Sequence, residues 1–384
     1  MMFRRTTDGA RMARGIGRNG ELFRELCDPA HLIRSARAAA RGKRRKPDVA
    51  KFLLELEPEC FRLAHELSSG LWRPGSYHTF TILEPKPRLI SAAPFADRVV
   101  HHAIVALLEP HFEKRFVEHS YACRKGKGTH RALLRASELS RRRKYVLKGD
   151  VVKFFPSIDH EILKQCVRRV IADTAVLRVL DLIIDGSNPQ EPAHEWFDGD
   201  DLFAPACRAR GIPIGNLTSQ FLANVFLDHL DHAVMDSLGC GEYIRYCDDF
   251  LIFSDDSTHL WSVRRAIERL LGDLRLRLHP RKGGVHATWS TIPFLGFTLR
   301  RGHRRLQRGG IVRATRRLRR GAREVIEGVI SEKGLRARVA AWLGHARFAS
   351  NPRAAYVVIS RARSSEAFER GRLENCLSTQ REVA

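Results

Sequence analysis

The sequence predicts an α+β protein in which several long helices accompany short antiparallel strands. The chain has 384 residues, of which 43% are hydrophobic and 29% charged, a balance typical of a globular protein with room for two or three domains. Segments with helical periodicity alternate with short runs of β-branched and aromatic residues. Two such runs, 242–246 and 251–253, flank a pair of adjacent aspartates, which indicates a β-hairpin.

Helical periodicity dominates the first part of the chain. Residues 1–20 are predicted to be a loose leader, and a helix is expected over about 21–41. A second helix is expected over about 49–67, where apolar residues recur mostly at helical spacing. Residues 78–91 are predicted to form a hairpin around a proline-rich turn, followed by a helix over about 97–108.

The middle of the chain begins with a buried strand at 144–152, where apolar residues predominate. Ser157 and Asp159 are both suitable caps for the helix that follows, which carries a continuous apolar stripe. Residues 186–210 are rich in Gly, Pro and Asp and are predicted to be an irregular insertion. A helix from about 218 to 238 then leads into the hairpin with the two aspartates.

After this hairpin we expect a helix near 259–274 and a pair of strands through 293–297. Residues 300–323 contain eleven arginines and no acidic residue, and a basic helix is predicted there. The alternative interpretation of this segment is a solvated charged face, but so many like charges repel one another unless an anion is present.

The net charge indicates a polyanionic partner. Lysine and arginine total 67 against 43 acidic residues, a formal charge of +24, and nucleic acid is the favoured polyanion. A membrane surface is the weaker alternative, because the basic residues are not confined to one amphipathic helix. No apolar run approaches the roughly 20 residues of a membrane span. The N-terminus has no secretory pattern and the eight cysteines form no C-x-x-C pair, so we expect a cytoplasmic protein without zinc or disulfides.

Three carboxylates stand at the ends of predicted strands. Asp150 lies near the end of the strand at 144–152, and Asp248 and Asp249 lie at the hairpin tip. Each alone has an ordinary interpretation, a strand-end cap or a solvated turn. Two-metal nucleotidyl transfer needs carboxylates gathered from separate strands, because each metal ion bridges enzyme and substrate phosphate. If the strands share one sheet, the three carboxylates suit that chemistry.

Six segments in order resemble motifs of reverse transcriptases. The resemblance covers roughly residues 50–350. The segments are Ser120 to His130, similar to the fingers motif of bacterial group II intron-like enzymes; Asp150 to His160, similar to the first catalytic-aspartate motif; Gly211 to Gln220, similar to the nucleotide-pocket motif; Tyr246 to Asp249, similar to the Y-x-D-D box; and Leu278 to Lys282 and Phe294 to Phe297, similar to later palm motifs.

The resemblance implies a right-hand polymerase with an antiparallel palm sheet. Its implied parts are a basic leader and helix at 1–48, fingers at 49–145, palm at 146–299, thumb at 300–365 and a polar tail at 366–384. It also implies two Mg²⁺ ions, with Mn²⁺ as a substitute, held by Asp150, the Val151 carbonyl and Asp248, with Asp249 close by as a further carboxylate.

The same resemblance implies which residues contact the substrates. Phe155 matches the aromatic that excludes a 2′-hydroxyl, although a lone Phe is more often a core residue. Lys282 matches a lysine proposed to protonate pyrophosphate, and an exposed structural lysine is its alternative. The implied nucleotide-binding residues are Lys86, Arg88, Phe155, Ile214, Gly215, Gln220 and Lys282, and the implied nucleic-acid-binding residues are Arg124, Lys125, Lys127, Arg316, Arg317, Arg319 and Arg320.

The pocket motif narrows the expected lineage. Most reverse transcriptases carry Pro-Gln-Gly and then Ser-Pro, whereas this chain has Pro213-Ile214-Gly215 and Ser219-Gln220. This variant resembles the enzymes of diversity-generating retroelements, which copy a template repeat with errors. The implied partners are an RNA template, the RNA–DNA hybrid, dNTPs and a small basic accessory protein. The alternatives are an antiphage-defence reverse transcriptase and a catalytically idle nucleic-acid-binding scaffold.

Overall fold

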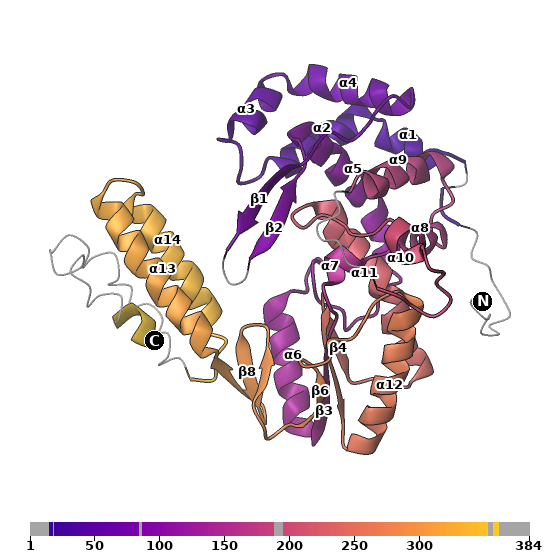
Figure 1. The fold of residues 1–384 in the computed structure, drawn as a ribbon. Coiled ribbons are helices and arrows are strands. Elements are labelled where there is room, and N and C mark those ends of the chain that lie inside the picture. The colour runs from indigo at the N-terminus through magenta and orange to yellow at the C-terminus, as the bar shows by residue number, and fades with distance from the viewer. Residues whose placement is uncertain (1–14, 18, 84–86, 188–194, 352–355, 361–384) are drawn as a thin grey trace. The chain divides into compact units, whose positions relative to one another are not determined.

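The computed structural model describes residues 15–17, 19–83, 87–187, 195–351 and 356–360 (Figure 1). The chain divides into two compact units. Unit 1 comprises Met1–Cys123, Gly149–Gly241 and Ser262–Gly283, and unit 2 comprises Arg124–Lys148, Glu242–Trp261 and Gly284–Ala384. Helices occur together with antiparallel sheets, as the sequence predicted. Among the described residues, no helix is both long and apolar enough to cross a membrane.

Unit 1 begins with helices that are shorter than predicted. Each of the two expected helices is broken in two, giving α1 (Glu21–Leu26), α2 (Pro29–Ala39), α3 (Pro47–Leu54) and α4 (Leu56–Ser68). The first break occurs because Asp28 caps a new helix, its carboxylate accepting from the backbone N–H groups of Ala30 and His31. The second occurs at Glu55, whose backbone angles (φ −111°, ψ 38°) are not helical. Within the predicted loose leader, Ile16 forms a parallel bridge with Ile171, and residues 1–14 lie outside the described part of the chain.

Helix α5 (Phe95–Glu113) is longer than the predicted 97–108 and lies at the centre of unit 1. Both α2 and α11 (Leu217–His232) pack against it. The rings of Phe112 in α5 and Phe221 in α11 meet edge to face, with centroids 5.2 Å apart. The predicted helix through residue 238 is confirmed, except that its last part is a π-helix, Ala233–Ser237.

Unit 1 also contains a β-hairpin and several shorter helices. They are the antiparallel hairpin of β1 (His78–Ile82) and β2 (Arg88–Ala92), and the helices α7 (Phe154–Ser157), α8 (His160–Arg168), α9 (Thr174–Asp185) and α10 (Ala204–Cys207). Of the two candidate caps, Asp159 caps α8 by accepting from the Ile162 N–H at 3.0 Å. Ser157 does not, because its hydroxyl donates to the Val152 carbonyl instead.

Unit 2 contains most of a four-stranded sheet in the order β4-β5-β3-β6 (Figure 1). The strands are β3 (Tyr145–Asp150), β4 (Tyr243–Tyr246), β5 (Asp249–Ser254) and β6 (Gly284–Ala287). The pairs β4–β5 and β3–β6 are antiparallel, so the predicted hairpin is confirmed. Helix α6 (Thr129–Arg142) packs against β4 and β5. Strand β3 and helix α12 (Ser257–Asp273) both cross the boundary between the units.

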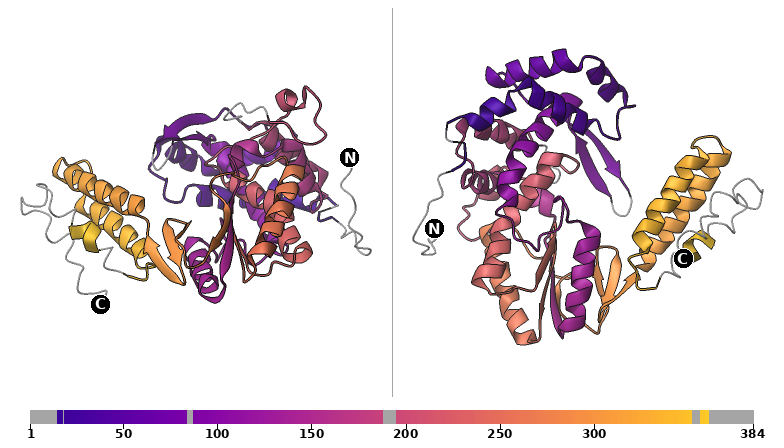
Figure 2. Two further views of the ribbon diagram at one scale, coloured as in Figure 1. Left: turned by 60° about the horizontal axis from the view of Figure 1, so that its bottom comes forward. Right: turned by 180° about the vertical axis from the view of Figure 1, so that it is seen from behind.

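A second antiparallel sheet in unit 2 leads to a pair of helices. Its strands are β7 (Ile292–Phe294), β8 (Phe297–Arg300) and β9 (His303–Leu306), and the helices are α13 (Arg308–Ile326) and α14 (Glu332–Ala346) (Figure 2). The predicted basic helix at 300–323 is therefore wrong for its first residues, which form β8, a turn and β9. Apolar side chains at every second position, such as Phe297 and Leu299, are buried there and favour strand pairing.

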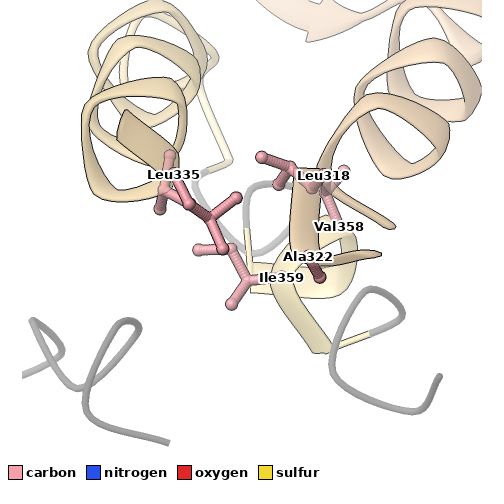
Figure 3. Packing of buried hydrophobic residues seen from close by; sticks show 6 residues of the cluster. Leu318, Ala322, Leu335, Val358 and Ile359 are labelled. Carbon is pink, nitrogen blue, oxygen red and sulfur yellow. The ribbon is translucent and has the colours of Figure 1, made fainter. Parts of the chain in front are cut away.

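The helix pair has its own small core. Leu318 and Ala322 of α13 pack against Leu335 and Val339 of α14, and Val358 and Ile359 cover them (Figure 3). Gly321 lets the helices approach closely, because a Cβ there would lie 3.0 Å from a Leu335 methyl group. The apolar stripe of α13 thus faces α14, while its arginines lie on the exposed face.

Candidate active site

Asp248 lies in a two-residue turn that a buried arginine holds in place. Tyr246 pairs with Asp249 at the end of the β4–β5 ladder, leaving Cys247 and Asp248 as the turn. Cys247 adopts a left-handed backbone (φ +59°), a conformation that suits tight hairpins and is uncommon for a side chain of this kind. The guanidinium of Arg245, which is 1% exposed, donates to the Cys247 carbonyl at 3.1 Å. The turn that presents Asp248 is therefore braced by a buried arginine.

Asp249 is paired with a lysine of the neighbouring strand. Nζ of Lys148 lies 2.8 Å from Oδ1 of Asp249, and both side chains are largely buried. The same ammonium donates to the Pro293 carbonyl at 2.9 Å and lies 5.9 Å from the centre of the Phe294 ring. Lys148 therefore neutralises one of the two adjacent carboxylates. Lys148 was not among the site residues predicted from the sequence, since its partner is 101 residues away along the chain.

Asp150 of unit 1 is held by the segment that resembles a later palm motif. Its backbone carbonyl accepts from the His279 N–H at 2.7 Å, and its side chain lies 3.1 Å from Nζ of Lys282. Nδ1 of His279 accepts from the backbone N–H of Lys282 at 3.2 Å, which shapes the turn that carries this lysine. Val151 is buried and bridges to Leu278. The structure thus brings Lys282 and Asp150 together.

The pocket motif is hydrogen-bonded to two other predicted site segments. The Ile212 N–H donates to the Phe155 carbonyl at 3.0 Å, and the Ile214 carbonyl accepts from the Ser91 N–H of β2 at 3.1 Å. Gly215 (φ +121°) is needed where it stands, because a Cβ would lie 3.0 Å from Cγ2 of Ile90. The structure therefore places Ile214 and Gly215 beside the strand that begins at Arg88, and it joins Phe155 to the pocket motif through Ile212.

A buried charge network, missed by the sequence analysis, supports this pocket motif. Asp159 is 1% exposed, and its carboxylate is 2.7 Å from Arg275 and 3.5 Å from Arg208. Arg208 also pairs with Asp200 of the predicted insertion. Asp159 bridges to Arg210 through the backbone, immediately before the pocket motif. The insertion is therefore anchored to α8 where it leads into the motif, and part of it forms α10.

The other predicted substrate contacts are scattered over both units. Lys86 lies outside the described residues, whereas Arg88 and Gln220 are exposed. Arg124 and Lys125 precede α6, and Lys127 lines a cavity of about 650 Å³ together with His130, His345 and Arg347. Arg316, Arg317, Arg319 and Arg320 are exposed on α13. Arg320 is 2.8 Å from Glu324, so a counter-charge lies one residue beyond the basic segment 300–323.

The donor chemistry suits a hard divalent cation. Among the residues described, no group of three or more His, Cys, Asp or Glu side chains is gathered so as to hold a metal ion. Mg²⁺ in polymerase-type sites is bound through one or two carboxylates plus substrate phosphates rather than an all-protein cage. Asp150 and Asp249 each contact a lysine ammonium. Carboxylate oxygens and the Val151 carbonyl would be the ligands.

Comparison with known proteins identifies the family. The family described as reverse transcriptase (RNA-dependent DNA polymerase) matches residues 82–299. Protein YkfC of Escherichia coli is 25% identical over 72% of this chain and 82% of its own length. Nuclear intron maturase 1 of Arabidopsis thaliana is 31% identical over 23% of this chain, and the putative COX1/OXI3 intron 1 protein of Saccharomyces cerevisiae is 21% identical over 57%.

The chain spans only 12% and 24% of the plant and yeast proteins, so their full activities do not carry over. Similarity to these proteins supports the predicted group II intron-like lineage. The family match covers more than half of the chain and includes Asp150, the pocket motif and the Asp248–Asp249 hairpin. This protein therefore belongs to the reverse transcriptase family and is, by family, an RNA-directed DNA polymerase, a nucleotidyltransferase.

Proposed function

We propose that this protein extends a primer along an RNA template by two-metal catalysis, within a right-hand arrangement of fingers (49–145), palm (146–299) and thumb (300–365). The observation that carries the proposal is the carboxylate set Asp150, Asp248 and Asp249 within the region matched by the family. Lys148 and Asp150 are two residues apart on β3, so their side chains leave the same face of the strand. The contact between Lys148 and Asp249 joins β3 to the hairpin that carries Asp248.

Each group has a distinct task in the proposed reaction. Asp150, Asp248 and the Val151 carbonyl would hold the metal ions, which when bound supply charge stabilisation for the attacking 3′-oxygen and the leaving pyrophosphate. Lys282, held beside Asp150, would donate a proton to that leaving group. Phe155 would lie under the incoming sugar and exclude a 2′-hydroxyl. Arg88 and Lys86 would bind the triphosphate, because guanidinium and ammonium groups offset phosphate charge.

The pocket motif supports a diversity-generating retroelement as the biological setting. Ile214 replaces the glutamine found in most reverse transcriptases, and the substitution removes a polar group without removing any of the three carboxylates. In this setting the enzyme copies a template repeat with errors and acts together with a small basic accessory protein. A defence role is the competing proposal. A template repeat and a variable repeat beside the gene would favour the retroelement, and their absence would favour defence.

Replacement of Asp248 by asparagine tests the catalytic assignment. The variant Asp248→Asn keeps the size of the side chain but removes a charge, so we expect primer extension to fall at least 100-fold, as it does when a group stabilising the transition state is lost. Affinity for a short RNA–DNA hybrid should change less than about threefold. The matched control is Asp256→Asn, which removes an exposed carboxylate beyond the far end of β5.

Single-nucleotide addition with saturating Mg²⁺ and dNTP is the suitable measurement, because it is insensitive to processivity. Extension by Asp248→Asn at more than a tenth of the wild-type rate contradicts the metal assignment. An equal loss in Asp256→Asn shows that the assay reports general damage rather than the loss of a ligand. If the wild-type protein binds the hybrid but does not extend the primer, the result supports the alternative of a catalytically idle nucleic-acid-binding scaffold.

A further inference from the structure

A basic hollow lies in unit 2 where the turn between β8 and β9 meets α6. It has a volume of about 370 Å³, and its lining includes Arg141, Arg301, His303, Arg304, Ser137 and Glu138. Figures 1 and 2 show the second sheet beside α6. Four observations, on location, backbone conformation, charge and aromatic exposure, favour a built site.

The hollow lies at the opposite end of α6 from the predicted catalytic hairpin. The first residue of α6, Thr129, donates from its hydroxyl to the Tyr246 hydroxyl, two residues before Asp248. Arg141 follows 12 residues later in the same helix, which corresponds to about 18 Å at 1.5 Å per residue. A ligand in the hollow would therefore be separate from the nucleotide bound at the hairpin.

The turn between β8 and β9 places Arg301 in a backbone conformation that is unfavourable for arginine. Arg301 (φ +43°) and Gly302 (φ +83°) both have left-handed backbones, a combination for which two-residue hairpin turns favour Asn, Asp or Gly. A long cationic side chain at such a position is strained and indicates a use for its charge. The Gly302 N–H donates to the Ser140 hydroxyl at 3.0 Å, and the Ser137 hydroxyl donates to the Gly302 carbonyl. The turn is thus locked onto α6.

Positive charge in the hollow exceeds the negative charge available to it. Glu138 already pairs with Arg135 at 2.8 Å and with Arg142 at 3.3 Å. Within the part of the chain that the structure describes, neither Arg141 nor Arg301 has an acidic partner. Both guanidiniums are exposed, and Arg304 is held between the Ser137 hydroxyl and the Phe348 carbonyl. Guanidiniums without acidic partners, gathered around a turn whose backbone is held in place, are suited to phosphate.

An aromatic ring is available beside these charges. Trp289 is 44% exposed, and the Arg301 guanidinium lies 5.9 Å from the centre of its ring. Tyr145 lies behind the same ring, with centroids 5.8 Å apart. Arginines next to an exposed aromatic face bind unpaired nucleotides, because bases stack on the ring while the guanidiniums contact the backbone. An acidic peptide would use the charges but leave the ring without a role.

We propose that this surface, formed by Arg141, Arg301, Arg304 and Trp289, binds a single-stranded segment of RNA outside the catalytic centre. The template of a reverse transcriptase is RNA, so a segment beyond the copied region is the natural occupant. Binding there would tether the enzyme to its template while the primer end enters and leaves the active site. The proposal depends on the family but not on the assignment of the metal ligands.

A binding experiment on enzyme already loaded with substrate tests this proposal. The full-length enzyme is saturated with a short, non-extendable RNA–DNA hybrid, and binding of fluorescent oligo(U) is measured by anisotropy over a range of salt concentrations. We expect wild type to bind the oligonucleotide without releasing the hybrid. The variant Arg141→Gln/Arg301→Gln loses two phosphate contacts, so its slope of log affinity against log salt should be less steep by about 1.4, at about 0.7 per contact.

Matched variants separate this effect from general damage. Arg265→Gln/Arg269→Gln removes two exposed arginines from α12 and should bind oligo(U) as wild type does. Trp289→Ala should weaken binding at least fivefold through loss of stacking, and Trp289→Phe should restore most of it. All variants should extend a primer on the short hybrid within twofold of the wild-type rate, since no catalytic residue is changed.

Three results would overturn the proposal. In the first, the hybrid displaces oligo(U) from wild type, so that both occupy one site. In the second, the Arg141→Gln/Arg301→Gln variant binds oligo(U) with the wild-type affinity and salt slope. In the third, that variant retains oligo(U) binding but loses binding of a poly-glutamate peptide, which would assign the surface to an acidic protein. Failure of Asp248→Asn to lose activity would leave this proposal standing.

Discussion

The backbone of Ile214 is held by a hydrogen bond that does not involve its side chain. Its carbonyl accepts from Ser91 of β2, so the backbone of the pocket motif is held whichever side chain stands there. The isoleucine side chain offers no donor or acceptor. A glutamine at this position could hydrogen-bond near the incoming nucleotide and restrain it against the template base.

We expect Ile214→Gln to raise copying accuracy. A hydrogen bond is worth about 0.5–1.5 kcal/mol net, so the error frequency should fall roughly two- to tenfold. The measurement is sequencing of cDNA made on one RNA template by wild type and variant, and by family resemblance the wild-type errors should concentrate at template adenines. Ile214→Leu, which stays apolar, should keep the wild-type error frequency. Equal accuracy of the two active enzymes would show that fidelity is determined elsewhere in the pocket.

Helix α5 illustrates how an element can carry a polar group without using it for binding. His101 is 1% exposed, and among the described residues neither of its ring nitrogens has a hydrogen-bond partner. Burial lowers the pKa of His101 from 6.5 to about 4, and the nearby His102 and Arg98 add to this effect. The folded protein therefore holds this imidazole in its neutral form, while the unfolded chain protonates it near pH 6.5.

This difference predicts a loss of stability in mild acid. Because the pKa of His101 is lower in the folded protein than in the unfolded chain, the unfolded chain binds more protons between these two values. The free energy of unfolding is therefore unaffected by His101 above about pH 6.5 and declines as the pH falls toward 4. At pH 5 the loss due to His101 should be about 2 kcal/mol, at about 1.4 kcal/mol per pH unit. His101→Phe should flatten this dependence, measured by denaturant unfolding at pH 7.5 and 5.

The exposed histidine of α4 provides the control for this experiment. His65→Gln removes an exposed side chain, so the pH dependence of the free energy of unfolding should remain that of wild type. The comparison uses the slope with pH rather than the stability at one pH, since phenylalanine also changes the packing of α5. A wild-type slope in His101→Phe would show that other groups control acid unfolding.

At the scale of the whole molecule, the net charge of +24 makes binding of nucleic acid sensitive to salt. Part of this charge lies on the exposed face of α13, where Arg316, Arg317 and Arg319 are accessible. Glu324 pairs with Arg320 at 2.8 Å and with Arg338 at 2.7 Å, so Arg320 has less charge to offer a duplex. A helix of this kind can follow phosphates without contacting base edges.

Replacing Arg316, Arg317, Arg319 and Arg320 by glutamine should weaken the salt dependence of hybrid binding. At about 0.9 per phosphate contact, loss of three contacts flattens the slope of log affinity against log salt by about 3. Processivity should fall more than single-nucleotide addition, because the active site is unchanged. The Arg265→Gln/Arg269→Gln variant serves as the control. An unchanged slope in the α13 variant would mean that this face does not contact the duplex.

Local patterns in the sequence determined the α+β class, the motif residues and the family. Periodicity, turn residues and motif spacing depend on residues that are near one another in the chain, so the β4–β5 hairpin and the apolar stripe of α8 were predicted correctly, and Asp159 was one of two candidate caps. The same local patterns wrongly predicted one helix where the structure has α1 and α2, and one where it has α3 and α4, because the periodicity continues across the breaks. Caps and backbone angles at single residues decided these boundaries.

Tertiary structure alone decided which distant groups meet. Lys148 reaches Asp249 across 101 residues, Arg275 reaches Asp159 across 116, and Lys282 reaches Asp150 across 132. Nothing in the spacing of these residues indicates the contacts, because strand order and helix packing bring such pairs together. The basic hollow on α6 arises in the same way, since a left-handed turn at Arg301 and two serines of a helix more than 160 residues earlier form it jointly. The sequence alone therefore determined the chemistry available to this protein, and packing decided which carboxylates are neutralised and where the remaining positive charge is concentrated.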